Sequence, residues 1–248
     1  MKNYDDSTYG DAFADVYDDW YSDVSDVGAT VATLRELGGA GHYLELGVGT
    51  GRLALALATA GVQVTGVDTS AAMLEQLRSN ALRNPEASPN LEVIQGDMID
   101  DLPDGPFSLV VIAYNTVFSL RSRLRQEQLF GAVSGRLAPG GVFVVEAAIP
   151  DPQRPPGGTV GVRSLSADRV VLSVDLHDPD TQTVDGQFVE FTESGGIRLR
   201  PWSIRYCHPW ELDEMAGAAG FTLRQRWSDM SRNPFDESSS THVSVYSF

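Results

Sequence analysis

A regular alternation of strand-like and helix-like segments between residues 42 and 149 constrains the fold most. HYLELG is followed by RLALALATAG and VQVTGVD by SAAMLEQLRSNALR, and the strand-like segments LEVIQGD, FSLVVIAYN and GGVFVVEAA come after them. Strands that are apolar almost throughout are buried on both faces, and a strand, helix, strand unit crosses over with a right hand. The alternation therefore predicts an α/β fold with a doubly wound, mainly parallel sheet over residues 42–149.

The segments on either side follow other patterns. Residues 1–41 are acidic and helical, and their apolar side chains recur every three or four residues, which predicts an aromatic stripe on one helix face. This stripe either packs on the core or closes over a ligand, and periodicity alone leaves both open. Its members are Phe13, Val16, Tyr17, Trp20, Tyr21 and Val24.

After Pro150 the pattern changes to the alternation of half-exposed antiparallel strands. The segments TVGVRSL, RVVLSVDL, QFVEFTE and IRLRPWSIRY are separated by turn residues, which predicts a β-rich insertion over residues 150–206 that covers one end of the sheet. Residues 207–248 contain a helix that starts at Pro209 and two strands, FTLRQRW and HVSVYSF. We expect these two strands to add an antiparallel hairpin to the sheet edge.

Composition narrows the classes of partner. The 248 residues include 18 Lys and Arg against 34 Asp and Glu, a formal net charge of −16, and this surface repels phosphate backbones and anionic lipids. We therefore expect neither a nucleic acid nor a membrane as partner. No apolar run approaches the roughly 20 residues of a membrane-spanning helix, and the acidic start differs from a signal peptide. Cys207 is the only cysteine, which excludes an internal disulfide. These features predict a cytoplasmic protein.

A glycine-rich turn follows the first predicted strand, in the stretch from Glu45 to Gly51. Glycines at Gly47, Gly49 and Gly51 allow a sharp turn and close approach of a ligand to the start of the next helix. Dinucleotide sites favour G-x-G-x-x-G, whereas this turn reads G-x-G-x-G after an acidic residue. The Glu45 carboxylate would repel a pyrophosphate and suits a positively charged, amino-acid-like ligand.

Carboxylates also end the second and third predicted strands. Asp68 follows Gly66-Val67 at a position where a carboxylate can accept both hydroxyls of a ribose. Asp97 ends the next strand, where it can accept from an exocyclic amine, and Met98 can pack on an adenine ring. Because the carboxyl ends of parallel strands meet at one sheet edge, these side chains are expected near the glycine turn.

Together these segments resemble the class I S-adenosylmethionine-dependent methyltransferases. The matching stretches are LELGVGTGRL, VTGVDTSAAML, VIQGDM, FSLVVIAYN and LAPGGVFVVE, which cover about residues 42–147 in family order. The C-terminal helix and strands look like the end of the family's seven-stranded, Rossmann-like sheet. YGDAFADVYDDWY is similar to the segment that forms a lid over the cofactor in small-molecule members, including amino-sugar N-methyltransferases. The resemblance thus implies S-adenosylmethionine as cofactor, residues 1–41 as a lid, and a role in secondary metabolism such as antibiotic biosynthesis.

The resemblance also implies the residues that hold the cofactor. The glycines would shape the loop against its methionine part, Glu45 would support its ammonium end, and Asp68 would bind its ribose. The expected cofactor-binding residues are Tyr9, Glu45, Gly47, Gly49, Gly51, Asp68, Thr69, Met73, Asp97, Met98 and Ala113.

On the acceptor side we expect methyl transfer to a nitrogen or carbon of a small natural-product-like molecule, mainly by positioning for in-line displacement. The candidate catalytic residues are His208, Asn115 and Tyr17. The candidate substrate-binding residues are Tyr21, Tyr114, Phe118, Glu146, Trp202 and Tyr206. We expect no metal, and His42, His177 and His242 have no partner evident in the sequence.

Several alternatives stay open. An O-methyltransferase would use His208 as its base, and a catalytically silent S-adenosylmethionine-binding protein would bind partners instead. An NAD-linked reductase is disfavoured because Lys2 is the only lysine, which leaves no Tyr-x-x-x-Lys pair. Asn115 does not belong to an Asn-Pro-Pro-Tyr motif, so methylation of DNA or of protein glutamine loses support. The sequence is compatible with a monomer or a homodimer.

Overall fold

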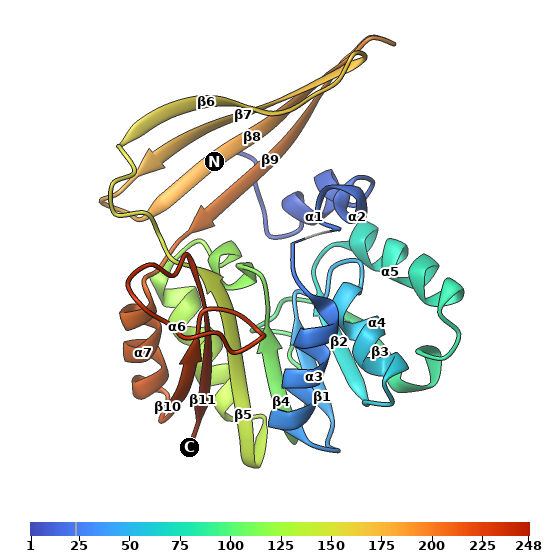
Figure 1. Cartoon of the computed structure of the whole chain (residues 1–248), viewed down its shortest axis with the longest axis vertical. Coiled ribbons are helices and arrows are strands. Elements are labelled where there is room, and N and C mark those ends of the chain that lie inside the picture. The colour runs from blue at the N-terminus through green and yellow to red at the C-terminus, as the bar shows by residue number, and fades with distance from the viewer. Residues whose placement is uncertain (23) are drawn as a thin grey trace.

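The computed structural model describes residues 1–22 and 24–248 and places two β-sheets one above the other. Figure 1 shows a seven-stranded sheet flanked by helices, which we call the large sheet, and a four-stranded sheet above it, which we call the small sheet. Helices α1 (Thr8–Phe13) and α2 (Tyr17–Trp20) lie beside the gap between them (Figure 1). The α/β class, the Rossmann-like large sheet and the separate antiparallel sheet confirm the predicted fold.

The large sheet has the strand order β10-β11-β5-β4-β1-β2-β3. The five strands β1 to β5 pair in parallel, while β11 pairs antiparallel with both β5 and β10. Strand order reverses between β1 and β4, and ligands of doubly wound sheets bind at such a point beyond the carboxyl ends of the strands. The strands are β1 (Tyr43–Leu46), β2 (Val64–Asp68), β3 (Leu91–Gln95), β4 (Phe107–Ile112), β5 (Leu137–Ala148), β10 (Thr222–Trp227) and β11 (Thr241–Ser247).

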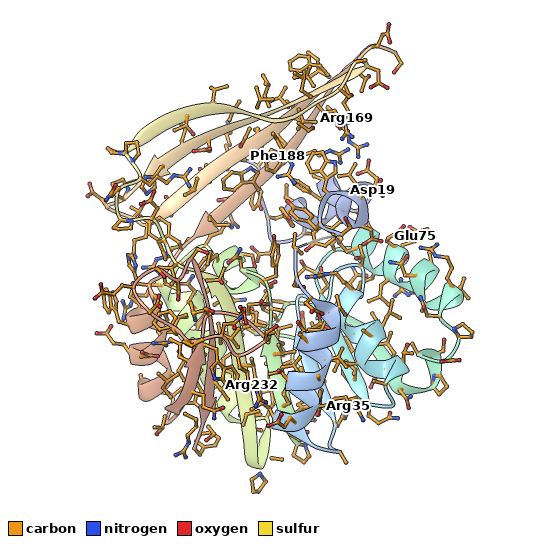
Figure 2. All side chains as sticks on the ribbon, in the orientation of Figure 1. Asp19, Arg35, Glu75, Arg169, Phe188 and Arg232 are labelled. Atoms are coloured by element: carbon orange, nitrogen blue, oxygen red, sulfur yellow. The ribbon has the colours of Figure 1, made fainter. Side chains whose placement is uncertain are left out.

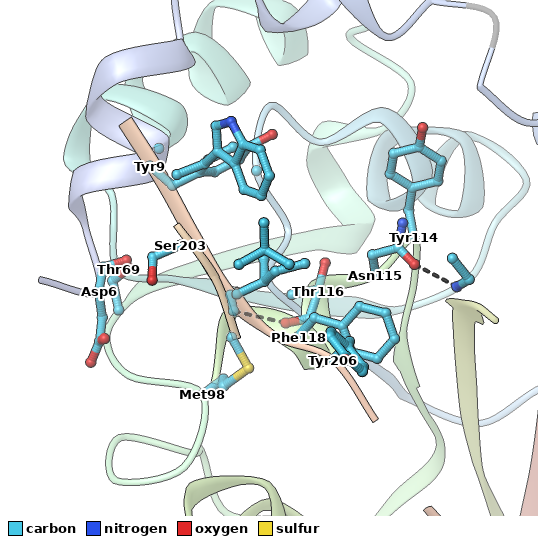
Figure 3. A pocket seen from close by; sticks show the side chains of 18 of the residues that line it. Asp6, Tyr9, Thr69, Met98, Tyr114, Asn115, Thr116, Phe118, Ser203 and Tyr206 are labelled. Atoms are coloured by element: carbon cyan, nitrogen blue, oxygen red, sulfur yellow. Dashed lines mark hydrogen bonds between the residues drawn. The ribbon is translucent and has the colours of Figure 1, made fainter. Parts of the chain in front are cut away.

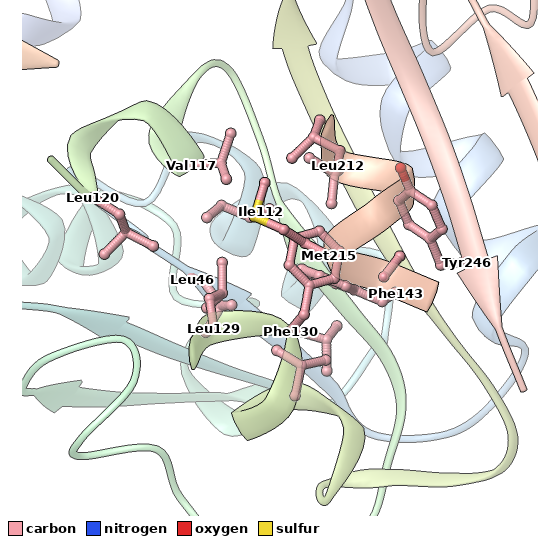
Figure 4. Packing of buried hydrophobic residues seen from close by; sticks show 14 of the residues in the cluster. Leu46, Ile112, Val117, Leu120, Leu129, Phe130, Phe143, Leu212, Met215 and Tyr246 are labelled. Carbon is pink, nitrogen blue, oxygen red and sulfur yellow. The ribbon is translucent and has the colours of Figure 1, made fainter. Parts of the chain in front are cut away.

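Helices cover both faces of the large sheet and explain its apolar strands. Along β4, Val110 and Ile112 face one hydrophobic cluster, while Leu109 and Val111 face the other. The first cluster includes Phe130 and packs between the sheet and helices α6 and α7 (Figure 4). The larger helices are α3 (Val27–Gly38), α4 (Arg52–Thr59), α5 (Ala71–Arg83), α6 (Arg123–Ser134) and α7 (Pro209–Ala218), and the 3₁₀ turns are η1 (Ser88–Asn90) and η2 (Thr116–Ser119).

Side chains at the helix starts agree with the sequence. Ser70 caps α5 by accepting from the Met73 N–H at 3.1 Å, and Asp26 caps α3 by accepting from the Ala29 N–H at 2.9 Å. Such caps satisfy backbone donors that have no partner within the helix. None of the helices in residues 1–22 and 24–248 has the length and apolar character needed to cross a membrane.

The small sheet is antiparallel, in the order β6-β7-β8-β9, and its inner face meets the N-terminal helices. Phe188 of β8, labelled in Figure 2, packs edge to face against Phe13 and Trp20, with ring centroids 5.8 and 5.6 Å away. Helix α3 instead inserts Leu34 into the core of the large sheet. Residues 1–41 therefore contribute α1 and α2 to the packing on the small sheet and α3 to the packing on the large sheet. The strands are β6 (Gly157–Leu165), β7 (Arg169–Asp178), β8 (Thr183–Thr192) and β9 (Ile197–Arg205).

Candidate active site

A cavity of about 520 Å³ lies between the carboxyl edge of the large sheet, the N-terminal helices and the inner face of the small sheet. Figure 3 shows side chains from all three regions around it. Its wall includes most of the residues expected to bind a ligand. These are Tyr9, Tyr17, Tyr21, Gly47, Gly49, Asp68, Thr69, Met73, Met98, Tyr114, Asn115, Phe118, Trp202 and Tyr206.

The glycine turn forms one end of this cavity. Gly47, Gly49 and Gly51 have φ angles of +69°, +55° and +85°, a region that side chains rarely adopt. A Cβ atom on Gly47 would lie 2.3 Å from Cγ2 of Thr116, whereas a Cβ on Gly49 would meet nothing within 4 Å. The turn is therefore pressed against η2 at Gly47 and open to the cavity at Gly49, while Gly51 stands behind it as the first residue before α4.

Asp68 ends β2 beside this turn. Its Oδ2 accepts from the Gly49 N–H and its Oδ1 accepts from the Ser70 N–H, both at 2.9 Å. Burial raises the pKa of Asp68, and the two backbone donors oppose that shift. A carboxylate oriented by two N–H groups can accept further hydrogen bonds from a ligand hydroxyl.

Glu45 lies within β1, behind the turn and outside the cavity wall. It is 5% exposed, and its Oε2 has no hydrogen-bond partner. Burial raises the pKa of Glu45 to about 8, although the nearby Arg52 opposes the shift. An unpartnered buried carboxylate oxygen destabilises the folded chain, so a donor supplied by a ligand would be stabilising here.

Tyrosines line the side of the cavity below α2. The Tyr17 and Tyr21 rings lie 4.8 Å apart between centroids, and Tyr21 meets Tyr114 edge to face at 6.2 Å. Tyr114 and Asn115 follow β4 with positive φ angles of 50° and 66°. The Oδ1 of Asn115 accepts from the Ala148 N–H at 2.6 Å, a bond drawn in Figure 3. Asn115 thereby joins the ends of β4 and β5 and holds the turn that presents Tyr114.

Known proteins resemble most of this chain. A family model described as "Methyltransferase domain" matches residues 44–141. The cypemycin N-terminal methyltransferase of a Streptomyces species is 30% identical over 185 residues, which are 73% of each chain. The chain belongs to the S-adenosylmethionine-dependent methyltransferases. It is an enzyme of the natural-product type with S-adenosylmethionine as its cofactor.

Solved structures support the same family. The CcbJ methyltransferase from Streptomyces caelestis is 41% identical, covers 98% of both chains and superposes with a TM-score of 0.90. CalS10, described as an amino pentose methyltransferase from Micromonospora echinaspora with bound S-adenosylmethionine, is 21% identical over 91% of both chains, with a TM-score of 0.65. At that identity, CalS10 shares the fold alone.

The residues of the methyltransferase fit the cofactor at three points. The orphaned Glu45 oxygen suits a ligand ammonium, the open space at Gly49 admits a close ligand, and Asp68 is oriented to bind hydroxyls. In the part of the chain that the structure describes, no group of three or more His, Cys, Asp or Glu side chains could hold a metal ion.

Asp97 and Ala113, expected to bind the cofactor, are absent from the cavity wall of the methyltransferase. Oδ1 of Asp97 accepts from the Arg125 guanidinium at 2.7 Å and from the Ile99 N–H at 2.8 Å. These partners both bind Oδ1, which closes the loop after β3, and the neighbours Gly96 and Met98 reach the cavity. Asp97 thus stabilises this loop, and its contact with the cofactor stays a prediction.

Glu146 and His208 also lie outside the wall. Oε2 of Glu146 accepts from the Tyr114 N–H at 3.1 Å, so this carboxylate supports the turn after β4. His208 precedes α7, and its ring stacks on Trp210 with centroids 6.2 Å apart. His208, the candidate base, is therefore not part of the wall, and its ring centroid lies 6.1 Å from that of Tyr206, which lines the wall.

Sequence reasoning missed several residues of the wall, including Tyr4, Arg154, His177 and Phe188. His177 has two partners, Pro155 and Tyr206, although none was evident in the sequence. The alternation along β7 carries the signal, because Asp175 and His177 share one face and both are buried. Only the pairing of β7 with β8 and β9 shows that this face meets the cavity.

Proposed function

We propose that this methyltransferase transfers the methyl group to an amine nitrogen of a small natural-product-like molecule. The observation that carries the proposal is the aromatic wall of the cavity, where Tyr17, Tyr21, Tyr114, Phe188 and Trp202 surround the space next to the glycine turn. Aromatic faces attract cations, and an amine is largely cationic near neutral pH.

Charges in the wall favour the same acceptor. Arg154 is the one arginine or lysine among the described residues of the wall, and its guanidinium is paired with Asp175 at 2.5 Å. The carboxylates of Asp6, Asp68 and Asp151 also line the cavity. An amine is attracted by this wall, whereas an anionic acceptor would be repelled. The relative named as an N-terminal methyltransferase also supports an amine acceptor.

We assign the cofactor to the end of the cavity with the glycine turn. There Gly47 and Gly49 approach its methionine part, Asp68 binds its ribose, and Tyr9, Thr69, Met73 and Met98 surround its adenosine. When bound, S-adenosylmethionine supplies a sulfonium whose methyl carbon is attacked in line while the sulfur keeps the electron pair. The tyrosines of α2 and of the β4 turn hold the acceptor on the opposite side and exclude water.

The size of the cavity supports a small acceptor. About 520 Å³ falls within the usual range of small-molecule sites, roughly 300–1,000 Å³. The wall draws on both sheets and on α1, so an acceptor would be surrounded by the chain on several sides. These features favour a free small molecule over a nucleic acid or a protein interior.

The test begins with calorimetric titration of S-adenosylhomocysteine, with NADH as a control. We expect only the former to bind. Transfer of a tritiated methyl group is then measured to amino sugars, to peptides with a free amino terminus, to phenols and to indoles, and product spectra identify the methylated atom. Preference for the amines supports the proposal. Preference for phenols would indicate an O-methyltransferase, preference for indole carbon a C-methyltransferase, and binding without transfer a silent cofactor-binding protein.

A further inference from the structure

We infer that Tyr206 and His177 form a proton-accepting pair that binds the amine group of the acceptor. This inference rests on the proposed function for the identity of the acceptor. It assigns the catalytic contact to Tyr206 and makes His177 a positioning residue that acts through Tyr206.

The small sheet brings the two side chains together from distant parts of the sequence. His177 pairs with Val184 across β7 and β8, and Val184 pairs with Ile204 across β8 and β9, two residues before Tyr206. The Nε2 of His177 lies 3.0 Å from Oη of Tyr206, and its Nδ1 lies 2.9 Å from the carbonyl oxygen of Pro155. His177 is 6% exposed, and both side chains line the cavity.

The Pro155 carbonyl decides which nitrogen of His177 carries the proton. A carbonyl oxygen only accepts, so Nδ1 must be the protonated nitrogen, and neutral His177 has its lone pair on Nε2. Tyr206 therefore donates its O–H to Nε2. Its own oxygen lone pairs stay available to accept from a ligand in the cavity, and the group that they fit is an N–H or O–H donor.

Burial and nearby charged groups act on the Tyr206 phenol. Burial raises the pKa of Tyr206, which retains the phenol proton. Arg154 and Asp175 balance each other as an ion pair, and the His208 ring lies 6.1 Å from the Tyr206 ring. The titratable or charged groups that face the pair are Arg154, Asp175, Asp178, Arg205, His208 and Glu211.

The pair gives a balanced route for the proton of an acceptor that arrives as an ammonium ion. That proton passes from nitrogen to Oη of Tyr206 as the phenol proton passes to Nε2 of His177. The nitrogen keeps the electron pair that forms its bond to the methyl carbon, and the carbon–sulfur bond breaks with its pair on sulfur. The product leaves as the methylated ammonium ion, and His177 then passes its proton through Tyr206 to solvent.

The tautomer is tested without an acceptor. In the full chain labelled with ¹⁵N-histidine, long-range ¹H–¹⁵N spectra should show His177 protonated at Nδ1, with its signals assigned by their loss in His177→Gln. Tyr206→Phe should shift the Nε2 signal, because it removes the donor to that nitrogen. A proton on Nε2 in the wild type would overturn the inference, whatever the enzyme methylates.

Turnover tests the proton route, with the best amine of the tritium screen as probe. We expect Tyr206→Phe and His177→Gln to lower kcat about 100-fold at pH 7, within the usual range for acid–base groups, with unchanged binding of S-adenosylhomocysteine. The deficit should shrink towards pH 10, where an aliphatic amine arrives neutral. Tyr43→Phe and His42→Asn are matched controls outside the cavity wall and should keep wild-type kcat.

The outcomes separate the two proposals. A deficit that stays constant from pH 6 to 10 would show that Tyr206 only packs against the acceptor and would overturn the proton route. Transfer to no amine by the wild type would contradict the proposed function, while the tautomer spectra still decide whether the pair exists.

Discussion

The two ends of the cavity are built in different ways. At the large sheet, Gly49 and Asp68 are joined by a hydrogen bond between residues 19 positions apart, and the β1–β2 register holds them in place. At the small sheet, Tyr4 accepts from the Ser203 N–H across 199 positions, and Arg200 binds Asp15 across 185. Backbone turns thus shape the end that we assign to the cofactor, whereas contacts between residues far apart in the sequence shape the end that we assign to the acceptor; we call these the cofactor end and the acceptor end.

Arg200 is central to the second end. Its side chain is almost fully buried, and it binds Asp15 at 2.6 Å, Glu190 at 3.1 Å and the carbonyl of Ala12. This guanidinium joins the segment between α1 and α2 to the small sheet. The N-terminal segment also contacts the large sheet, where Ser70 donates to Asp11 at 2.6 Å. The acceptor end therefore depends on one small helical segment held between two sheets.

The largest effect is expected on cofactor affinity when the Asp68 carboxylate is removed from the cofactor end. Asp68→Ala removes the proposed bonds to the ribose and the anchor of the Gly49 N–H, so S-adenosylhomocysteine should bind about 100-fold more weakly, since hydrogen bonds to a charged group contribute about 1.5–3 kcal/mol. Calorimetry measures this loss. Asp151→Ala is the control, because Asp151 lines the cavity and bonds to the Gln153 N–H. Equal losses of S-adenosylhomocysteine affinity in Asp68→Ala and Asp151→Ala would remove the contrast between the two ends of the cavity.

The next effect concerns the acceptor end. Arg200→Met leaves Asp15 and the largely buried Glu190 without this partner, so the free energy of unfolding should fall by about 2 kcal/mol, and α1 and α2 should exchange amide hydrogens faster. Urea unfolding and hydrogen exchange measure both. Arg198→Met is the matched control, because Arg198 also pairs with Asp15 but is half exposed, and such pairs contribute about 0.5 kcal/mol. Similar losses in both variants would contradict a special role for Arg200.

A smaller effect on the free energy of unfolding is expected in the glycine turn. Two alanine variants distinguish a steric clash with Thr116 from the strain of a positive φ angle. Gly47→Ala places a methyl group against Thr116 and also strains the backbone, whereas Gly61 has a φ of +83° with open space around its Cβ position. We expect losses of about 2 kcal/mol for Gly47→Ala and about 1 kcal/mol for Gly61→Ala in urea unfolding. A loss at Gly47 no greater than that at Gly61 would mean that η2 moves aside freely.

Proton release tests the role of Glu45. Its pKa in the folded chain, about 8, lies above the usual 4.5, so between these values the folded chain binds more protons than the unfolded one. The free energy of unfolding should therefore fall as pH rises through this window, and Glu45→Gln should flatten the dependence.

If a ligand ammonium pairs with ionised Glu45, binding of S-adenosylhomocysteine at pH 7 releases close to one proton. Calorimetry in phosphate and in Tris measures this release, and none at all would contradict the pairing.

The smallest effect is expected at His208. His208→Gln should change turnover less than twofold, because the ring stacks on Trp210 outside the cavity wall. Initial rates with the best amine and the best phenol of the screen measure it. A loss of tenfold or more with the phenol would restore His208 as a base and favour the O-methyltransferase alternative.

The sequence predicted the fold class and most of the wall at the cofactor end. Gly47, Gly49 and Asp68 were found because turn chemistry and strand ends are local, and local patterns survive in the sequence. Asp97 shows the limit of this approach. A carboxylate at a strand end can bind a ligand or close its own loop, and the sequence does not show that Arg125, 28 residues away, donates to Oδ1 of Asp97.

The acceptor end shows the same limit more strongly. Tyr17, Trp202 and Tyr206 were expected from their aromatic character, but His177 was overlooked and His208 was favoured. Both histidines lie beside turns, and the alternation along β7 places His177 on one face of its strand without showing what that face meets. Their difference arises when β7, β8 and β9 pair, because the register brings His177 to within 3.0 Å of Tyr206, while the His208 ring stacks on Trp210 outside the wall.

Local sequence was sufficient for the Rossmann-like sheet, the glycine turn and the carboxylate beside it, because hydrogen-bond geometry and apolar periodicity act over a few residues. Tertiary structure alone decided which side chains share the acceptor end. The residues that meet there come from the two sheets and the N-terminal helices, and their neighbours follow from the pairing of strands and from the buried contacts of Arg200.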